Sequence, residues 1–199
     1  MTTTFFLVRH ASHGLLGRVL TGRVLDVSLS PEGREEAQRL GRRFSGEPIS
    51  AVQSSPQVRC QQTAGPIAES VKRPVEVAEA VDEIDVGEWT GRDLKTLASD
   101  PRWQCWNEAR STTRAPGGET MSEVQDRVIA HLTRVRASYP EGQIVVVSHA
   151  DVIRAAVLYY LGASLDLFHR IEISPAGVST LVVGDWGAKI FSLNETVPA

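Results

Sequence analysis

The chain has 199 residues, of which 42% are hydrophobic and 23% are charged. This is the composition of a globular domain, and it excludes a disordered or collagen-like chain. The formal net charge is -3, from 21 Lys and Arg against 24 Asp and Glu. Such a balance argues against a nucleic acid or an anionic membrane as the partner. We therefore expect a single domain, 1–199, in which any cationic site is local.

The two cysteines and the start of the chain bear on the cellular compartment. Cys60 and Cys105 do not form a CxxC pair and are too few for a disulfide scaffold, which fits a reducing interior. The apolar run 5–8 is too short for the core of a signal peptide or for a membrane span. We expect a cytoplasmic protein that does not insert into a membrane.

The first half of the chain alternates strand signals with helix signals. A serine followed by proline is typical of a helix start, because the hydroxyl caps free N–H groups and proline fits the first turn. Such pairs occur at Ser30-Pro31 and at Ser55-Pro56. The predicted elements are, in order, strand 5–8, helix 30–46, strand 49–52, helix 55–70 and strand 75–77.

The second half begins with an irregular region, 82–118, and then becomes regular. Apolar residues recur at helical spacing between Ser122 and Ser138, which predicts an amphipathic helix. Two alternating runs near the end indicate a hairpin that turns at 184–187. The predicted elements are helix 122–138, strand 143–147, helix 152–161 and hairpin strands 177–183 and 189–193.

This alternation predicts an α/β fold, with a largely parallel central sheet. Sheets of this kind bind ligands at the carboxyl ends of their strands. Polar pairs follow three of the predicted strands: Arg9-His10, Ser54-Ser55 and Ser148-His149. We expect these three pairs to meet at one edge of the sheet.

The charges at this edge favour a phosphate ligand. Arg9, together with Arg59 in the first turn after Pro56, would bring two guanidinium groups to the same edge as the two histidines. Guanidinium groups match tetrahedral oxyanions through paired hydrogen bonds. A helix N-terminus adds backbone N–H donors. The sequence contains neither GxxxxGK[ST] nor GxGxxG, so a nucleotide fold has no support.

Five stretches between residue 7 and about residue 156 match one family pattern in the same order, and a loop at 116–120 matches between the last two. The stretches are 7–11 (LVRHA), 29–37 (LSPEGREEA), 54–64 (SSPQVRCQQTA), 82–91 (DEIDVGEWTG) and 146–149 (VVSH). In these stretches the chain resembles the histidine phosphatase superfamily, the group that contains the cofactor-dependent phosphoglycerate mutases. One stretch alone is a weak signal, but five in order are specific.

The resemblance implies a three-layer α/β sandwich and a mechanism without metal or cofactor. In that mechanism His10 is the nucleophile and forms a phosphohistidine. Arg9, Arg59 and His149 would hold the phosphoryl oxygens. Glu83 would protonate the leaving group and then deprotonate the hydrolytic water. The residue chemistry agrees, because the surrounding cations favour the neutral imidazole of His10.

The chain departs from the family pattern beside both histidines. Ser12-His13 follows Ala11 where many relatives have other residues, so His13 or Thr21 would supply the missing phosphate contacts. Ala150-Asp151 replaces the common pair of small residues after His149. If Asp151 faces the pocket, its carboxylate would disfavour a second phosphate or carboxylate on the substrate.

Several other groups have simpler interpretations. His10, His13 and His149 could suggest a metal site, but two flanking guanidinium groups would repel a cation, so we expect no metal. Arg127 and its neighbours Arg134 and Arg136 fit the solvated face of a helix better than an RNA-binding patch. The three tryptophans at 89, 103 and 106 either cover the pocket or belong to the core.

The sequence thus predicts a phosphomonoesterase for a small phosphorylated metabolite, with residues 82–118 as a small lid. Hydrolysis is favoured over the mutase reaction because the region 90–118 is shorter than the corresponding region of phosphoglycerate mutases. A phosphoglycerate mutase remains the alternative. A non-catalytic phosphate-binding protein would need neither His10 nor Glu83. The natural substrate and the oligomeric state stay open.

Overall fold

A six-stranded sheet forms the middle layer of the structure, a computed structural model in which residues 1–196 are described. The strand order is β4-β3-β6-β1-β7-β8. The strands are β1 (Thr2–Arg9), β3 (Ile49–Ser54), β4 (Val75–Val77), β6 (Gln143–Ser148), β7 (Val178–Gly184) and β8 (Gly187–Glu195). The first four strands of that order pair in parallel, whereas β7 and β8 pair antiparallel as the predicted hairpin. The prediction of a largely parallel sheet is confirmed.

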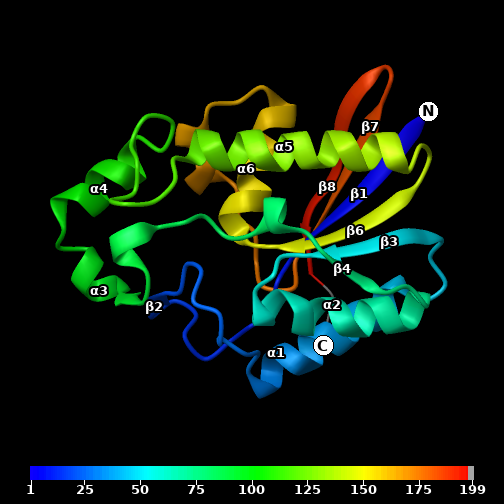
Figure 1. The fold of residues 1–199 in the computed structure, drawn as a ribbon, viewed down its shortest axis with the longest axis horizontal. Helices are drawn as coiled ribbons and strands as arrows, with labels where there is room; N and C mark the ends of the chain where they lie inside the picture. Colours follow the sequence, from blue (N-terminus) through cyan, green and yellow to red (C-terminus); the bar gives the residue numbers. More distant parts are fainter. Residues whose placement is uncertain (197–199) are drawn as a thin grey trace.

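Helices cover both faces of this sheet (Figure 1). Helices α1 (Pro31–Phe44) and α2 (Val58–Val71) lie on one face, and α5 (Met121–Ser138) and α6 (Ala150–Leu161) lie on the other. The buried side chains of β6 alternate accordingly, because Ile144 and Val146 pack in the core of α5 and α6 while Val145 and Val147 pack in that of α1 and α2. This alternation follows from the pleat of a strand. The three-layer α/β sandwich is confirmed.

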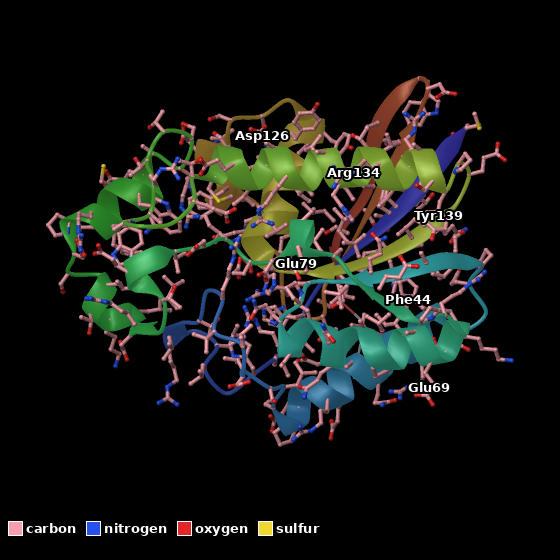
Figure 2. All side chains as sticks on the ribbon, viewed as in Figure 1. Phe44, Glu69, Glu79, Asp126, Arg134 and Tyr139 are labelled. Carbon is pink, nitrogen blue, oxygen red and sulfur yellow. The ribbon has the colours of Figure 1, made fainter. Side chains whose placement is uncertain are left out.

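The helices pack against the sheet through their apolar sides. Phe44, the last residue of α1, packs edge to face against Phe6 of β1 with ring centroids 5.2 Å apart. The outer surface of α5 carries exposed polar residues such as Asp126 and Arg134 (Figure 2). The apolar side of each helix therefore faces the sheet and the polar side faces solvent.

Of the two predicted serine-proline helix starts, one is right and one is wrong. Ser30 caps α1 by accepting a hydrogen bond from the Gly33 N–H at 3.1 Å, and Pro31 is the first helical residue. Helix α2 begins only at Val58, and its N-cap residue makes no side-chain cap. The Ser55 hydroxyl accepts from the Gln57 N–H at 3.3 Å and donates to Asp82 at 3.0 Å, in a turn that precedes the helix.

The region 79–118 folds into short elements, most of which lie at one end of the molecule (Figure 1). Its elements are the 3-10 turns η1 (Glu79–Val81) and η2 (Gly87–Trp89), strand β5 (Arg92–Asp93) and helices α3 (Leu94–Leu97) and α4 (Pro101–Glu108). Strand β5 pairs with β2 (Val19–Leu20), and a further 3-10 turn, η3 (Leu165–Arg170), follows α6. Residues 197–199 of the expected domain lie outside the described part. Within residues 1–196, no helix has the length and apolar character that a membrane crossing requires.

The sheet brings the three predicted polar pairs together. Strands β3, β6 and β1 are adjacent, and their register pairs Arg9 with Ser148 and Ser54 with Val147. Beyond the strands, the N–H of His10 donates to the carbonyl of Ser148 at 2.9 Å. The carboxyl ends of all three strands therefore lie at one edge, as expected.

Helix α1 passes so close to the loop after β1 that only glycine fits at position 33. A Cβ atom on Gly33 would lie 1.9 Å from the carbonyl oxygen of Ser12. We expect Gly33→Ala to destabilise the fold by about 1–3 kcal/mol, although alanine favours helices, because the loop must move. Urea unfolding would measure this. The exposed substitution Glu35→Ala in the same helix should stay within about 0.5 kcal/mol, and equal effects of the two changes would contradict the prediction.

Candidate active site

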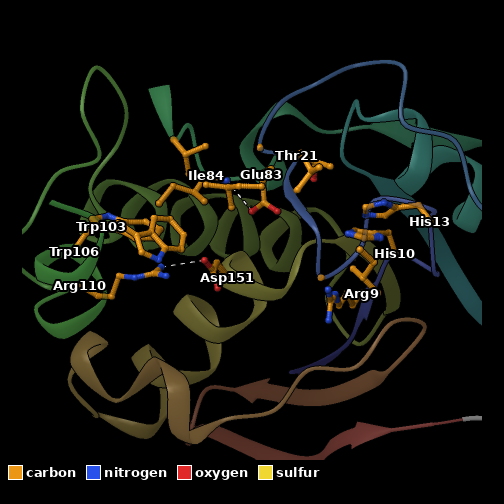
Figure 3. A pocket seen from close by; sticks show the side chains of 16 residues that line it. Arg9, His10, His13, Thr21, Glu83, Ile84, Trp103, Trp106, Arg110 and Asp151 are labelled. Carbon is orange, nitrogen blue, oxygen red and sulfur yellow. Dashed lines mark hydrogen bonds and ion pairs between the residues drawn. The ribbon is translucent and has the colours of Figure 1, made fainter. Parts of the chain in front are cut away.

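A pocket of about 170 Å³ opens at the carboxyl edge of the sheet (Figure 3). Five of the predicted site residues line it: Arg9, His10, His13, Thr21 and Glu83. The remaining lining residues are Leu16, Gly17, Val19, Leu20, Gly22, Ile84, Val86, Trp103, Trp106, Arg110 and Asp151. The other two predicted residues, Arg59 and His149, are fully buried next to this lining.

His10 is held as a neutral imidazole with one nitrogen free. Its Nδ1 lies 2.9 Å from the carbonyl oxygen of Ala11. Because a carbonyl only accepts, Nδ1 carries the proton and Nε2 keeps its lone pair. Burial, followed by the positive charges of Arg59 and Arg9, holds the pKa of His10 well below its usual value. The ring therefore stays uncharged near neutral pH, as a nitrogen nucleophile requires.

Helices α1 and α2 hold the loop that follows His10. The Ala11 N–H donates to the hydroxyl of Thr63 at 2.9 Å. The N–H and hydroxyl of Ser12 donate to the two carboxylate oxygens of Glu36, at 2.8 and 3.0 Å. Both helices thus fix the position of the imidazole.

Two guanidinium groups flank His10. Arg9 donates from Nη1 to the carbonyl of Ile173 at 2.6 Å. Arg59 donates from Nη2 to the carbonyl of Gly22 at 2.7 Å, and the same nitrogen lies 3.4 Å from Nδ1 of His149. These contacts fix two positive charges at this edge of the sheet, Arg9 in the pocket lining and Arg59 buried next to it.

His149 lies between Ser55 and Glu83. Its Nε2 is 2.8 Å from the hydroxyl of Ser55, which donates its own proton to Asp82. Nε2 must therefore be the protonated nitrogen of the neutral ring, so Nδ1 carries a lone pair 3.4 Å from the carboxyl group of Glu83. The rings of His149 and His10 lie 5.3 Å apart between centroids. Burial and the Arg59 charge hold the pKa of His149 well below its usual value.

Glu83 has the properties of an acid that works near neutrality. Burial is the largest cause that raises its pKa from 4.5 to about 7, and the charge of Asp151 adds to it against the opposing guanidinium groups. Asp82 accepts from the Glu83 N–H at 2.7 Å. Arg23 and Arg127 donate to the Glu83 carbonyl, at 2.8 and 3.1 Å. The backbone of this acid is therefore fixed from both sides.

Arg127 differs from its predicted role as part of a solvated helix face. Besides Glu83, it donates to the carbonyl of Ala80 at 2.8 Å and to the carboxylate of Glu119 at 3.0 Å. Its guanidinium group thus donates to partly buried backbone carbonyls of the segment that follows β4, where such carbonyls need hydrogen-bond donors. Helical spacing alone could not show this, because the acceptors come from a distant segment.

His13 and Thr21 lie where the sequence analysis expected further phosphate ligands. The His13 ring is 5.3 Å from the His10 ring, and burial with the charges of Arg59 and Arg9 lowers its pKa to about 4. Nδ1 of His13 accepts from the Leu15 N–H at 3.3 Å, so Nε2 carries the proton and can donate. The side chains of both residues line the pocket.

The pocket wall also contains charged and aromatic residues that the sequence analysis placed only in part or missed. Trp103 and Trp106 line the pocket, whereas Trp89 packs behind them in the core. Asp151 does face the pocket, but its carboxylate is paired with guanidinium groups, so the expected repulsion of a second anion does not follow. Arg110 was not predicted, because nothing in its local sequence marks it.

The arrangement suits phosphoryl transfer to nitrogen. A neutral imidazole with a free Nε2, flanking guanidinium groups and a carboxyl group with a pKa near 7 lie around one small pocket. Within residues 1–196, no three His, Cys, Asp or Glu side chains are grouped so that they could hold a metal ion.

Comparison with known proteins identifies the family. The family model described as "Histidine phosphatase superfamily (branch 1)" matches residues 5–196. Phosphoserine phosphatase 1 of Hydrogenobacter thermophilus is 31% identical over 194 residues, which cover 96% of this chain and 91% of that protein. Both findings confirm the resemblance seen in the sequence motifs.

Solved structures share the fold over nearly the whole chain. The Bacillus stearothermophilus protein YhfR superimposes with a TM-score of 0.91 at 22% identity, covering 98% of each chain. A mutant phosphoserine phosphatase from Entamoeba histolytica, in complex with phosphoserine, gives a TM-score of 0.87 at 23% identity, covering 97% of each chain. The chain therefore belongs to the histidine phosphatase superfamily and is an enzyme that hydrolyses phosphate esters.

Proposed function

We propose that this enzyme hydrolyses a small phosphomonoester in two steps, with a phosphohistidine on His10 as the intermediate. The observation that carries the proposal is the buried, neutral His10, whose Nδ1 donates to Ala11, whose Nε2 is free, and whose pKa is held down by burial and by the charges of Arg59 and Arg9. A pocket of about 170 Å³ is below the usual range for drug-sized ligands, which favours a substrate of a few carbon atoms.

In the first step, the lone pair on Nε2 of His10 attacks the phosphorus atom. The N–P bond forms while the bond between phosphorus and the ester oxygen breaks. Glu83 donates its proton to that oxygen, and the alcohol leaves. The pKa of Glu83 near 7 supports this role, because the carboxyl group is partly protonated when the substrate arrives.

In the second step, the same carboxylate acts as a base. Glu83 takes a proton from water, the water oxygen attacks phosphorus, and the N–P bond breaks to release inorganic phosphate. His10 recovers its lone pair and Glu83 recovers its proton, so both groups return to their starting states. One residue serves both steps because the alcohol and the water occupy the same side of the phosphoryl group.

Arg9 and Arg59, with His13, Thr21 and His149, form the proposed phosphate clamp. The guanidinium groups neutralise charge that spreads over the phosphoryl oxygens in the transition state. His13 donates from Nε2, and the hydroxyl of Thr21 is a further donor. In this proposal the arginine side chains supply the positive charge that stabilises the transition state, so no metal or cofactor is needed. The reaction takes place in the cytoplasm.

Under the same proposal, residues 1–199 act as one domain and residues 82–118 cover the pocket. Ile84, Val86, Trp103, Trp106 and Arg110 of this segment line it. Contacts to the rest of the chain hold this segment in place. For example, the hydroxyl and N–H of Ser111 donate to the carboxylate of Asp166, each at 2.8 Å.

The proposed substrate is a small phosphorylated metabolite. Its support is that one relative named above is a phosphoserine phosphatase and that another was solved in complex with phosphoserine.

Replacing the nucleophile tests the proposal directly. We expect His10→Ala to lower kcat for p-nitrophenyl phosphate by roughly 10³-fold or more, with and without a chelator, because the variant lacks the nitrogen that forms the proposed intermediate. Brief incubation of the unmodified enzyme with ³²P-labelled substrate should yield acid-labile, base-stable label on His10. Equal turnover by both proteins would refute the mechanism.

The products separate hydrolysis from the mutase reaction. Supplied with 3-phosphoglycerate and a trace of the bisphosphate, the enzyme should release inorganic phosphate. Isomerisation to 2-phosphoglycerate without phosphate release would overturn the hydrolase proposal while leaving the phosphohistidine in place.

The pKa of Glu83 predicts a pH dependence. Since this pKa is raised to about 7, the protonated acid predominates below pH 7 and is lost above it. The single-turnover rate of alcohol release from an alkyl phosphate should therefore fall about tenfold per unit above pH 7. Glu83→Gln should abolish that slope and lower the rate by about 10²–10⁴-fold.

A leaving group that needs no proton is the control for this experiment. The p-nitrophenolate ion leaves unprotonated near neutral pH, so its initial burst should depend little on pH or on Glu83. If Glu83→Gln lowered the rate of alcohol release from the alkyl phosphate and the burst of p-nitrophenolate by the same factor, Glu83 would not be the acid that protonates the leaving group.

A further inference from the structure

Glu119, which directly precedes the N-cap of α5, binds two arginines with its carboxylate. Its Oε2 accepts from Nη2 of Arg23 at 2.8 Å. Its Oε1 accepts from Nε of Arg127 at 3.0 Å, and Oε2 accepts from Nη2 of the same arginine at 3.2 Å. The pairing with Arg127 is therefore bidentate, a geometry that fixes the plane of a guanidinium group. Glu119 lies outside the pocket lining, so it would act on the reaction only through other residues.

Both arginines also donate to the backbone of Glu83. Nε of Arg23 reaches the Glu83 carbonyl oxygen at 2.8 Å, and Nη2 of Arg127 reaches the same oxygen at 3.1 Å. Two guanidinium groups that share one acceptor repel each other, and a carboxylate bound to both of them offsets that repulsion. The charge of Glu119 therefore allows two cations to hold one carbonyl.

Glu119 also binds the backbone two residues beyond Glu83. The N–H of Asp85 donates to Oε2 of Glu119 at 2.9 Å, and the N–H of Glu119 donates to the carbonyl of Asp85 at 2.8 Å. The two backbones approach so closely that a Cβ atom on Gly118 would lie 2.2 Å from that carbonyl oxygen. The segment that carries Glu83 is therefore fixed to the start of α5 at two neighbouring residues.

The direction of the Glu83 carboxyl group depends on the peptide that joins residues 83 and 84. Oε1 of Glu83 accepts from the Ile84 N–H of this peptide at 2.9 Å. The carbonyl that accepts from Arg23 and Arg127 belongs to the same peptide. Because a peptide group is planar, hydrogen bonds that fix its carbonyl also fix the direction of its N–H. The two arginines thus control where the N–H, and with it the carboxyl group, can point.

We propose that Glu119 is a positioning residue for the proton transfers made by Glu83. Its carboxylate orients Arg23 and Arg127, the two guanidinium groups hold the 83–84 peptide, and this peptide directs the carboxyl group of Glu83 toward the ester oxygen. The inference rests on the proposed function, in which Glu83 is the acid. It predicts that a side chain outside the pocket affects proton transfer without affecting the attack by His10.

Two leaving groups separate positioning from a general effect on the fold. Glu119→Gln keeps the shape of the side chain but replaces one acceptor oxygen by a donor. We expect it to lower the single-turnover rate of alcohol release from an alkyl phosphate by about 10–100-fold, the loss expected when a catalytic group is misplaced by about an ångström. The burst of p-nitrophenolate, which leaves without a proton, should change by less than about twofold.

A double variant shows whether Glu119 acts through Glu83. In Glu83→Gln the acid is already lost, so adding Glu119→Gln should lower alcohol release by less than about twofold further. Glu88→Gln is the matched control, because it makes the same chemical change in the same segment. The carboxylate of Glu88 lies 3.4 Å from Nη1 of Arg102, and both side chains are exposed. This control should leave the rates for both leaving groups unchanged.

The outcomes distinguish this inference from the proposed function. The inference is wrong, while the phosphatase reaction stands, if Glu119→Gln lowers both rates by the same factor or leaves both unchanged. It is also wrong if Glu119→Gln lowers alcohol release as strongly in Glu83→Gln as in the unmodified enzyme. If Glu83→Gln itself affects both leaving groups alike, the proposed role of Glu83 fails and the inference fails with it.

Thermal unfolding checks the fold of each variant. Should Glu119→Gln unfold, Arg23→Lys decides the question, because lysine keeps the charge but loses the planar group that reaches both Glu83 and Glu119. It should show the same selective loss of alcohol release, and equal effects on the two leaving groups would overturn the inference.

Discussion

The parallel pairing of β1 with β6, and of β6 with β3, is the constraint on which the site depends. Arg9 ends β1, and His10 and His149 follow directly after β1 and β6, so the strand register fixes the relative positions of these three residues. Arg9 is opposite Ser148 in that register, and His10 and His149 come next in each chain segment. A shift by one residue would turn every side chain of a strand to the other face. The hydrophobic cores on the two faces of the sheet prevent such a shift. Ile144 and Val146 pack in the core beneath α5 and α6, whereas Val145 and Val147 pack in the core beneath α1 and α2.

Burial at this edge acts on two kinds of titratable group in opposite directions. It disfavours the charged form of any side chain, so the pKa of His10 falls and that of Glu83 rises. The guanidinium groups of Arg9 and Arg59 strengthen the first shift and oppose the second. The carboxylate of Asp151 then helps to keep the pKa of Glu83 high. Near neutral pH, His10 is therefore neutral while Glu83 is partly protonated, in the same pocket.

Motifs with a local physical cause could be predicted, whereas contacts between distant segments could not. The β-branched run of β6 and the capped start of α1 follow from neighbouring residues, and both are where the sequence indicated. The start of α2 is different: the helix begins only at Val58, after a turn in which the Ser55 hydroxyl accepts from the Gln57 N–H and donates to Asp82, from a segment that follows η1. The donors of Arg127 likewise reach the carbonyls of Ala80 and Glu83, more than forty positions earlier in the chain.

The amino-acid sequence by itself determined the order of the main helices and strands outside residues 82–118, the α/β class, the family and the hydrolysis of phosphate esters. These depend on short patterns and on the intrinsic properties of imidazole, guanidinium and carboxyl groups. Only the tertiary structure decided which charged side chains lie next to each other and form ion pairs. From the sequence, Asp151 was expected to repel a second anion on the substrate. In the structure its carboxylate is paired with Arg110 and Arg154. The state of an ionisable side chain depends on burial and on charges within a few ångströms, and folding brings those neighbours together from far along the chain.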